Sequence, residues 1–275
     1  MFNGVFSSLF LTLWGMLKGI IIFLLKVIGL ALIPILTACI IYAVYYKIKG
    51  FKAITNELVN VREPNILYKL FVQLPRQIIL DYYTLDPNMF KEFGFYMVVG
   101  EQGSGKSMTI AYLLDKWQKT YPKLKVYTNM NYHFEDGSIK SFDQLSLNTN
   151  GIYGEVDALD EVQSFLGVEY SLKFPEALKE IICQQRKVRR CILGGTQNFE
   201  SVAKPVRQQC RYIFYPSTYF GCFTIVSQYK CNLDKDYIFD RNKNKPIKRF
   251  CFVHDEHLRT IYDSYKTVDK IKIIK

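Results

Sequence analysis

The sequence of 275 residues lacks several features that would place it in a simple class. Its seven cysteines are an odd number without a C-x-x-C pair, which argues against a disulfide framework and is typical of reduced cytosolic thiols. It contains no internal repeat and no low-complexity tract, which excludes a repeat architecture. The N-terminus also lacks the basic start of a cleavable signal peptide.

Charge is scarce at the beginning of the chain. The first 46 residues hold only two charged side chains, Lys18 and Lys26. The run from Val27 to Tyr46 is uncharged and has the length that a helix needs to cross about 30 Å of hydrocarbon. Pro34 lies inside this run, and membrane helices tolerate such a proline. The sequence therefore predicts one transmembrane helix near residues 27–46.

The lysines after this run indicate its orientation. Lys47, Lys49 and Lys52 follow it directly, and the positive-inside rule assigns that side to the cytosol. Most of the chain is therefore expected to face the cytosol. The segment from Phe2 to Leu25 is compatible with a second span, an interfacial helix or an extension of the first helix, so one or two spans remain open.

Beyond this membrane segment, residues 1–46, the pattern of the sequence changes. Residues 47–92 form a connector broken by prolines, residues 93–217 alternate strand-like and helix-like runs, and residues 218–275 form a basic segment with further strands. Alternating strands and helices predict an α/β domain with a mostly parallel sheet and helices on both faces. Strands are expected at residues 95–100, 125–130, 151–159, 190–197, 211–217 and 222–230, and a helix at 174–188.

A glycine-rich stretch follows the first of these strands. The sequence GEQGSGKS matches the pattern G-x-x-x-x-G-K-[ST] between an apolar strand and a helix. Glycines there let backbone amides turn toward phosphates at a helix N-terminus. Lys106 is expected to reach the β- and γ-phosphates, and Ser107 to offer a hydroxyl to Mg²⁺. ATP and Mg²⁺ are the expected cofactors, and the candidate nucleotide contacts are Gly100, Glu101, Gln102, Gly103, Ser104, Gly105, Lys106, Ser107 and Met108.

Hydrolysis needs a second, acidic element. Asp160 and Glu161 follow an apolar run and are expected at the carboxyl edge of its strand, beside the glycine loop. Asp160 would then assist Mg²⁺, and Glu161 would polarise the attacking water. Glu155 and Asp157 interrupt the apolar run that a buried parallel strand should have. The alternative, that the pair merely begins a solvated helix, therefore remains open.

A third element follows the strand expected at residues 190–197. Gln197 at its end would place an amide near the γ-phosphate. Arg207 and Arg211 are spaced like residues one helical turn apart, which suits a face pointing at a neighbouring subunit's nucleotide. An ordinary surface role for each arginine is equally open.

The same region is rich in basic residues. From Lys179 to Arg211 there are eight Lys or Arg against two Glu, and the whole chain carries a net charge of +11. This charge favours an anionic partner, either membrane lipid or nucleic acid, and a solvated helix face explains the block equally well. Because no aromatic pattern supports base readout, any DNA contact is expected at the backbone.

Three blocks carry a resemblance to a known family. They are LPRQIILDYYTLDPNMFKEFG leading to the glycine loop, NGIYGEVDALDEVQ at the acidic element, and QQRKVRRCILGGTQNFESVAKPVRQQCRYI. With these blocks, residues 74–217 resemble the Zot (zonula occludens toxin) type P-loop ATPases. These are filamentous-phage assembly and export proteins that belong with the FtsK and HerA-like motors.

The resemblance implies an FtsK/HerA-like P-loop NTPase fold. It implies that Lys106 and Ser107 bind nucleotide and magnesium, that Asp160 and Glu161 form the acidic pair, and that Gln197 is the polar sensor. It also implies a homo-oligomeric ring or cluster in the host inner membrane, with a cytosolic ATPase domain and coat or export-channel proteins as partners. The familiar members carry their membrane helix after the ATPase domain, whereas here it comes first.

Two other functions compete with phage export. The first is a DNA-translocating motor for packaging or conjugation, in which the basic block contacts the DNA backbone. The second is a nucleotide-gated membrane adaptor that does not hydrolyse ATP, which is favoured if Glu161 proves unimportant.

Overall fold

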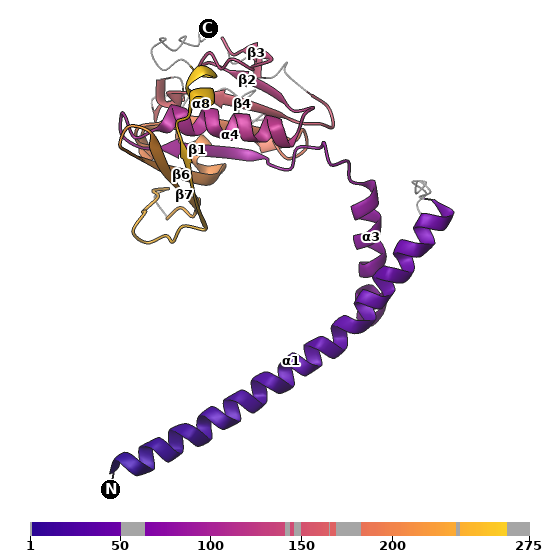
Figure 1. The fold of residues 1–275 in the computed structure, drawn as a ribbon. Coiled ribbons are helices and arrows are strands. Elements are labelled where there is room, and N and C mark those ends of the chain that lie inside the picture. Colours follow the sequence, from indigo (N-terminus) through magenta and orange to yellow (C-terminus); the bar gives the residue numbers. More distant parts are fainter. Residues whose placement is uncertain are drawn as a thin grey trace. The chain divides into compact units, whose positions relative to one another are not determined.

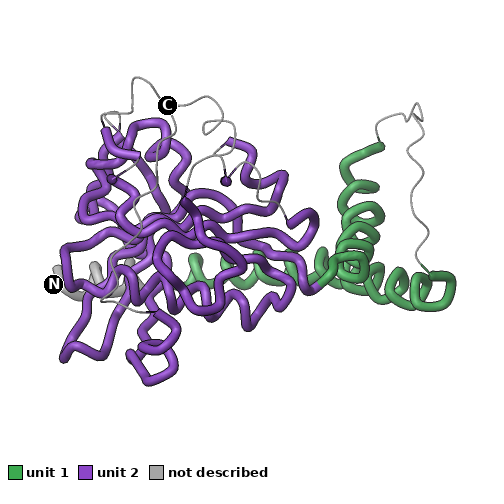
Figure 2. Tube along the Cα trace, turned by 90° about the horizontal axis from the view of Figure 1, so that it is seen from above, with its two compact units in different colours: residues 1–86 green, residues 87–275 purple. Residues whose placement is uncertain are grey.

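The computed structural model describes residues 2–50, 64–140, 144–145, 150–164, 166–168, 183–234 and 237–262, with side chains from Trp14 onward. The chain divides into two compact units, Met1–Asp86 and Pro87–Lys275, which Figure 2 shows in different colours. The division falls inside the connector expected at residues 47–92.

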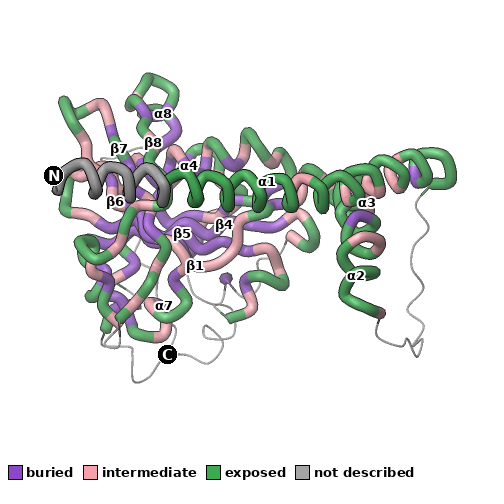
Figure 3. Tube along the Cα trace, turned by 90° about the horizontal axis from the view of Figure 1, so that it is seen from below, coloured by how far each residue is buried: buried purple, intermediate pink, exposed green. Residues whose placement is uncertain are grey.

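The first unit is dominated by one long helix, α1, Phe2–Lys49. Its 48 residues would span about 72 Å at 1.5 Å per residue, more than twice the hydrocarbon thickness of a bilayer. From Trp14 to Lys49 it is long and apolar enough to cross a membrane, and Figure 3 shows most of that stretch as exposed. The helix continues unbroken through Pro34. The segment Phe2–Leu25 therefore extends the predicted membrane helix, which disfavours a separate second span.

The connector adds a second helical stretch to this unit. Its parts are α2 (Ile66–Tyr68), the π-helical turn η1 (Lys69–Gln73) and α3 (Leu74–Thr84). It packs on α1, where Arg76 Nε donates a hydrogen bond of 2.9 Å to the Tyr46 hydroxyl. Pro75 follows the wide turn, and proline cannot donate the backbone hydrogen bond that a regular helix requires there.

The second unit is built on an eight-stranded sheet of order β3-β2-β4-β5-β1-β6-β7-β8 (Figure 1). Its strands are β1 Gly94–Val99, β2 Lys125–Thr128, β3 Gly137–Ser138, β4 Glu155–Leu159, β5 Arg190–Thr196, β6 Cys210–Tyr219, β7 Phe223–Lys230 and β8 Lys248–Val253. The strands from β3 to β6 pair in parallel, and β7 and β8 are antiparallel. The predicted mostly parallel sheet is confirmed. The sheet also continues across residue 217, so the expected core and C-terminal segment share it.

Both faces of the sheet are covered. The helical elements described here are α4 (Lys106–Thr120), η2 (Val162–Ser164), η4 (Phe199–Ser201), α7 (Lys204–Gln208) and α8 (Glu256–Thr260). Along β1 the side chains alternate, so that Tyr96 and Val98 join the core beneath α4 and α8, whereas Phe95 and Met97 join the core beneath η2, η4 and α7. The helix expected at 174–188 lies mostly outside the described residues.

The two acidic residues inside β4 are explained by the neighbouring strand. Arg190 on β5 is the register partner of Glu155, forms an ion pair with it, and lies 3.2 Å from the Asp157 carboxylate. All three side chains are buried. Arg190 thus lies beside two carboxyl groups. Burial raises the pKa of Asp157 to about 8, although the positive charge of Arg190 opposes this shift.

This cluster predicts a pH-dependent stability. In the native state the Asp157 carboxyl keeps its proton up to about pH 8, whereas in the unfolded chain it ionises near pH 4. The native state therefore binds more protons between these values, and stability should fall as pH rises from about 4 to 8, by at most about 1.4 kcal/mol per pH unit. Asp157→Asn cannot ionise, so its stability should depend less on pH than the wild type's over this range.

Thermal unfolding of the full chain in detergent, followed by the fluorescence of the core residue Trp117, measures this effect. The comparison is best made in a Trp14→Phe background, which leaves Trp117 as the remaining tryptophan. Parallel pH profiles for wild type and Asp157→Asn would show that Asp157 is ionised in the native state.

Candidate active site

The glycine loop turns sharply between β1 and α4. Gly103 and Gly105 both have positive φ, +80° and +91°, in the left-handed region that glycine adopts without strain. A Cβ at Gly105 would also lie 2.4 Å from Thr218 Oγ1. This position therefore requires glycine for its backbone conformation and for the space beside β6.

Lys106 begins α4 and lies across the loop. Its ammonium donates a hydrogen bond of 3.0 Å to the Glu101 carbonyl. Burial lowers the pKa of Lys106, and the carboxylates of Asp160 and Glu161 oppose this effect. The lysine thus lies within the electrostatic field of both acidic residues that the sequence predicted beside it.

The predicted acidic element meets the loop directly. Ser107 Oγ donates a hydrogen bond of 2.5 Å to Asp160 Oδ2, although the two residues are 53 positions apart. Asp160 follows β4, and in the sheet β5 separates β4 from β1. The glycine loop follows β1 and Asp160 follows β4. Because these strands are parallel, both segments lie at the same edge of the sheet, where the carboxyl ends of the strands meet.

The chain has the fold of a P-loop NTPase. Its carboxyl sheet edge brings together the two elements that handle phosphate and metal in such proteins. The prediction of this fold class is confirmed.

The sequence did not identify the residues that hold Asp160 at this edge of the sheet. Asn129, just after β2, accepts a 2.7 Å hydrogen bond from the Asp160 amide and donates one of 3.1 Å to the Asp160 carbonyl. On the other side, a Cβ at Gly195 of β5 would lie 2.6 Å from Asp160 Oδ1. A buried amide therefore clamps the Asp160 backbone, and a glycine leaves room for its side chain. The glycine pair inside an apolar strand was the available signal, because glycine in a strand marks a close approach.

Glu161 has an unusual backbone. Its φ is +54°, a left-handed value that costs a non-glycine residue free energy, and its amide donates 3.0 Å to Asp160 Oδ1. The side chain is exposed and near enough to influence the pKa of Lys106. Strained residues of this kind cluster at functional sites, so the conformation supports a functional role for Glu161.

Gln197 also lies at this edge of the sheet. The Gly100 amide at the start of the loop donates 3.2 Å to the carbonyl of Thr196, the residue just before Gln197. The Gln197 side chain is exposed. Among the remaining loop residues, Glu101 and Gln102 are exposed, whereas Met108 packs against the core beneath α4. Met108 can therefore offer a nucleotide its backbone more readily than its side chain.

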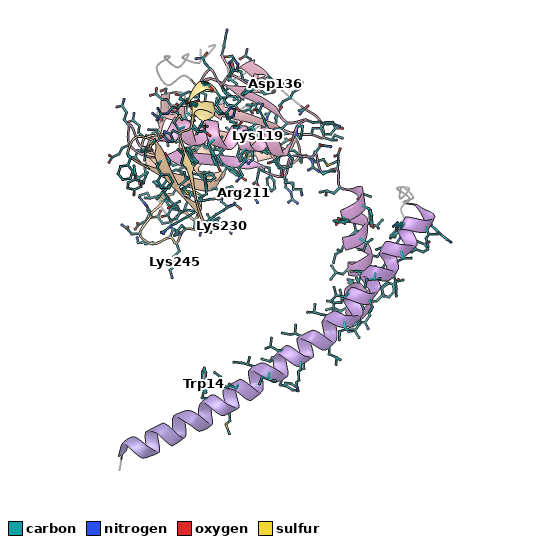
Figure 4. The ribbon with its side chains drawn as sticks, viewed as in Figure 1. Trp14, Lys119, Asp136, Arg211, Lys230 and Lys245 are labelled. Atoms are coloured by element: carbon teal, nitrogen blue, oxygen red, sulfur yellow. The ribbon has the colours of Figure 1, made fainter. Side chains whose placement is uncertain are left out.

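The predicted helical pairing of the two arginines is wrong. Arg207 lies in the short helix α7 and donates 2.8 Å to the Tyr237 carbonyl, whereas Arg211 lies in β6. Arg211 donates 3.2 Å to the Phe93 carbonyl and stacks on that ring, at the amino end of β1 and thus at the opposite sheet edge from the loop. Figure 4 shows Arg211 and Lys230 at one end of the β6–β7 pair. A strand begins between the two arginines, so they share no helical face.

A hydrogen-bonded chain links the loop to the last strands. Thr218 Oγ1 of β6 donates 3.0 Å to the Ser104 carbonyl and lies 2.7 Å from Thr224 Oγ1 of β7. Thr224 lies 2.7 Å from Nε2 of His254, which follows β8. Thr218 and Thr224 belong to no recognisable sequence motif. They brace the phosphate loop from the side opposite Asp160.

Comparison with known proteins gives distant likenesses. No family model and no curated protein matches the chain. The N-terminal domain of zonular occludens toxin from Neisseria meningitidis is 14% identical with a TM-score of 0.42, covering 62% of this chain and 98% of that one.

Two further structures are similar at a lower level. The genome packaging NTPase from Sulfolobus turreted icosahedral virus 2, in complex with ATP-gammaS, is 17% identical with a TM-score of 0.37, covering 49% of this chain and 78% of that one. The FIGL-1 AAA domain in complex with ADP is 14% identical with a TM-score of 0.30, covering 59% and 56%. Because these scores are low, the fold assignment rests on the strand order and the phosphate loop.

Proposed function

We propose that this chain is a membrane-anchored ATPase that uses ATP hydrolysis to drive the assembly and export of filamentous phage through the host inner membrane. The observation that carries the enzymatic part is the 2.5 Å hydrogen bond between Ser107 and Asp160. It joins a phosphate-loop hydroxyl to a carboxylate from a strand that is distant in sequence.

The donor atoms at this point suit magnesium. A serine hydroxyl and a carboxylate are oxygen ligands, and Mg²⁺ binds through one or two such protein groups together with substrate phosphates. Asn129 and Gly195 fix Asp160 in this position. Mg²⁺ bound to Ser107 and Asp160 would neutralise charge on the β- and γ-phosphates.

The remaining residues supply binding and proton transfer. The loop amides and Lys106 hold the β- and γ-phosphates, and Gln197 reports whether the γ-phosphate is present. Glu161 orients a water molecule for attack on the γ-phosphorus and accepts its proton. The bond from the γ-phosphorus to the bridging oxygen breaks, and ADP leaves with that oxygen.

The membrane and export parts of the proposal have separate support. The helix α1 is long and apolar enough to cross a bilayer, and its basic end at Lys47 and Lys49 favours a cytosolic ATPase unit. The phage role, the oligomeric ring or cluster, and coat or export-channel partners rest on the family resemblance. Because Arg211 is bound at the opposite edge of the sheet, the arginines no longer support a subunit-bridging role.

One observation favours a DNA-translocating motor as a second candidate. Arg186 and Lys187, just before β5, are exposed in the described part of the basic block. Exposed cations of this kind suit contacts to the DNA backbone.

The two functions differ in how ATP turnover responds to DNA. We expect the full chain in lipid nanodiscs to hydrolyse ATP at the same rate with and without added DNA, and loss of turnover in the phage host to stop virion release. Turnover that rises with DNA and falls steeply with salt would favour the motor. Nucleotide binding without any turnover would leave only the adaptor.

A further inference from the structure

The hairpin between β6 and β7 ends in two exposed aromatic side chains next to the phosphate loop. Phe220 is 96% exposed and Tyr219 is 50% exposed. Tyr219 is the last residue of β6 and pairs with Phe223 of β7, and Phe220 begins the short turn between the two strands. We use the name aromatic tip for Tyr219 and Phe220.

The turn places Phe220 in an unfavourable backbone conformation. Phe220 has φ +53° and Gly221 has φ +67°, so two successive residues are left-handed. This conformation is unfavourable for a bulky aromatic residue. Because the Phe220 ring is exposed, no burial of the ring offsets that cost. The exposed ring therefore points to a binding role.

The position of the tip is fixed relative to the phosphate loop. Thr218 donates to the Ser104 carbonyl at 3.0 Å, and Thr218, Thr224 and His254 form the bracing chain behind it. Phe220 follows Thr218 by two residues, which is at most about 7 Å of extended chain. The backbone of Phe220 thus lies close to the point where β6 contacts the phosphate loop.

The sheet order gives the direction of a bound nucleotide. Ser107 and Asp160 mark the side on which the metal and terminal phosphate lie, toward β5 and β4. A nucleotide whose terminal phosphate lies there can extend its nucleoside to the other side of the loop, away from Asp160. On that side of β1 the next elements are β6 and the aromatic tip.

We propose that the aromatic tip is the nucleobase platform of this site, with the ring of Phe220 stacking on the base. This inference rests on the proposed nucleotide function and extends it to the base. An aromatic face binds any base through its π surface, so the contribution of Phe220 should be similar for ATP and GTP.

The test compares two ligands that share phosphates and differ in the nucleoside. The full chain in detergent is titrated with magnesium ATPγS and with magnesium tripolyphosphate. Base stacking predicts that Phe220→Ala weakens ATPγS binding by about fivefold or more and leaves tripolyphosphate binding unchanged. Phe220→Trp should keep the wild-type affinity for ATPγS.

The control is Phe134→Ala, which removes a phenylalanine side chain that is 50% exposed in the β2–β3 connection. It should bind both ligands as the wild type does. Equal losses of ATPγS and tripolyphosphate affinity in Phe220→Ala, or no loss of either, would overturn the base platform. If the wild type binds neither ligand, the proposed nucleotide function fails and the platform fails with it.

Discussion

Glu161→Gln will reduce ATP turnover by about 10²- to 10⁴-fold while nucleotide affinity stays within about twofold of the wild type. The amide keeps the size of the side chain but cannot accept a proton from the attacking water. The strained backbone of Glu161 and its electrostatic influence on Lys106 support this role at the phosphate loop. Phosphate release by the full chain in nanodiscs measures turnover, and titration with labelled ATPγS measures affinity.

Glu256→Gln is the matched control, because Glu256 is an exposed glutamate at the start of α8. It should hydrolyse ATP at the wild-type rate. Hydrolysis retained in Glu161→Gln would remove this residue from the mechanism. Turnover and affinity lost together would instead indicate that the substitution distorts the loop.

Lys106→Ala will remove most nucleotide affinity, at least about 30-fold, and turnover will fall with it. Lys106 is the loop's ammonium group, partly desolvated and adjacent to both acidic residues. Without it, the phosphates lose a charge-assisted hydrogen bond, and Asp160 and Glu161 repel the nucleotide without compensation. Equilibrium binding of labelled ATPγS to the detergent-solubilised chain gives the affinity.

Lys116→Ala provides the comparison on the same helix, since Lys116 is exposed on α4. This variant should bind nucleotide normally. If Lys106→Ala and Lys116→Ala had the same small effect, the phosphate loop would not be the nucleotide site.

The sequence predicted the parts of the site that local patterns determine. The phosphate loop follows from its glycine spacing, and the position of Asp160 follows from the apolar run that becomes β4. Parallel strands place their carboxyl ends at one edge, so these two elements could be expected to meet. The predicted membrane helix likewise follows from a long uncharged run.

The remaining parts depend on contacts between distant segments. Glu155 and Asp157 interrupt the apolar pattern on which the strand prediction depends, and only the pairing of β4 with β5 shows that Arg190 offsets their burial. The four-residue spacing of Arg207 and Arg211 predicts one shared helix face, but β6 begins at Cys210, between the two arginines. Asn129 and Thr218 carry no motif, and their roles require the order of strands in the sheet.

The central claim is that Ser107 and Asp160 together hold the metal of a bound nucleotide. Ser107→Cys tests it most directly, because sulfur binds softer metals better than it binds Mg²⁺. We predict that turnover by this variant is low with Mg²⁺ and recovers with Mn²⁺ or Cd²⁺, whereas the wild type works best with Mg²⁺. The same metal preference in both proteins would contradict the claim.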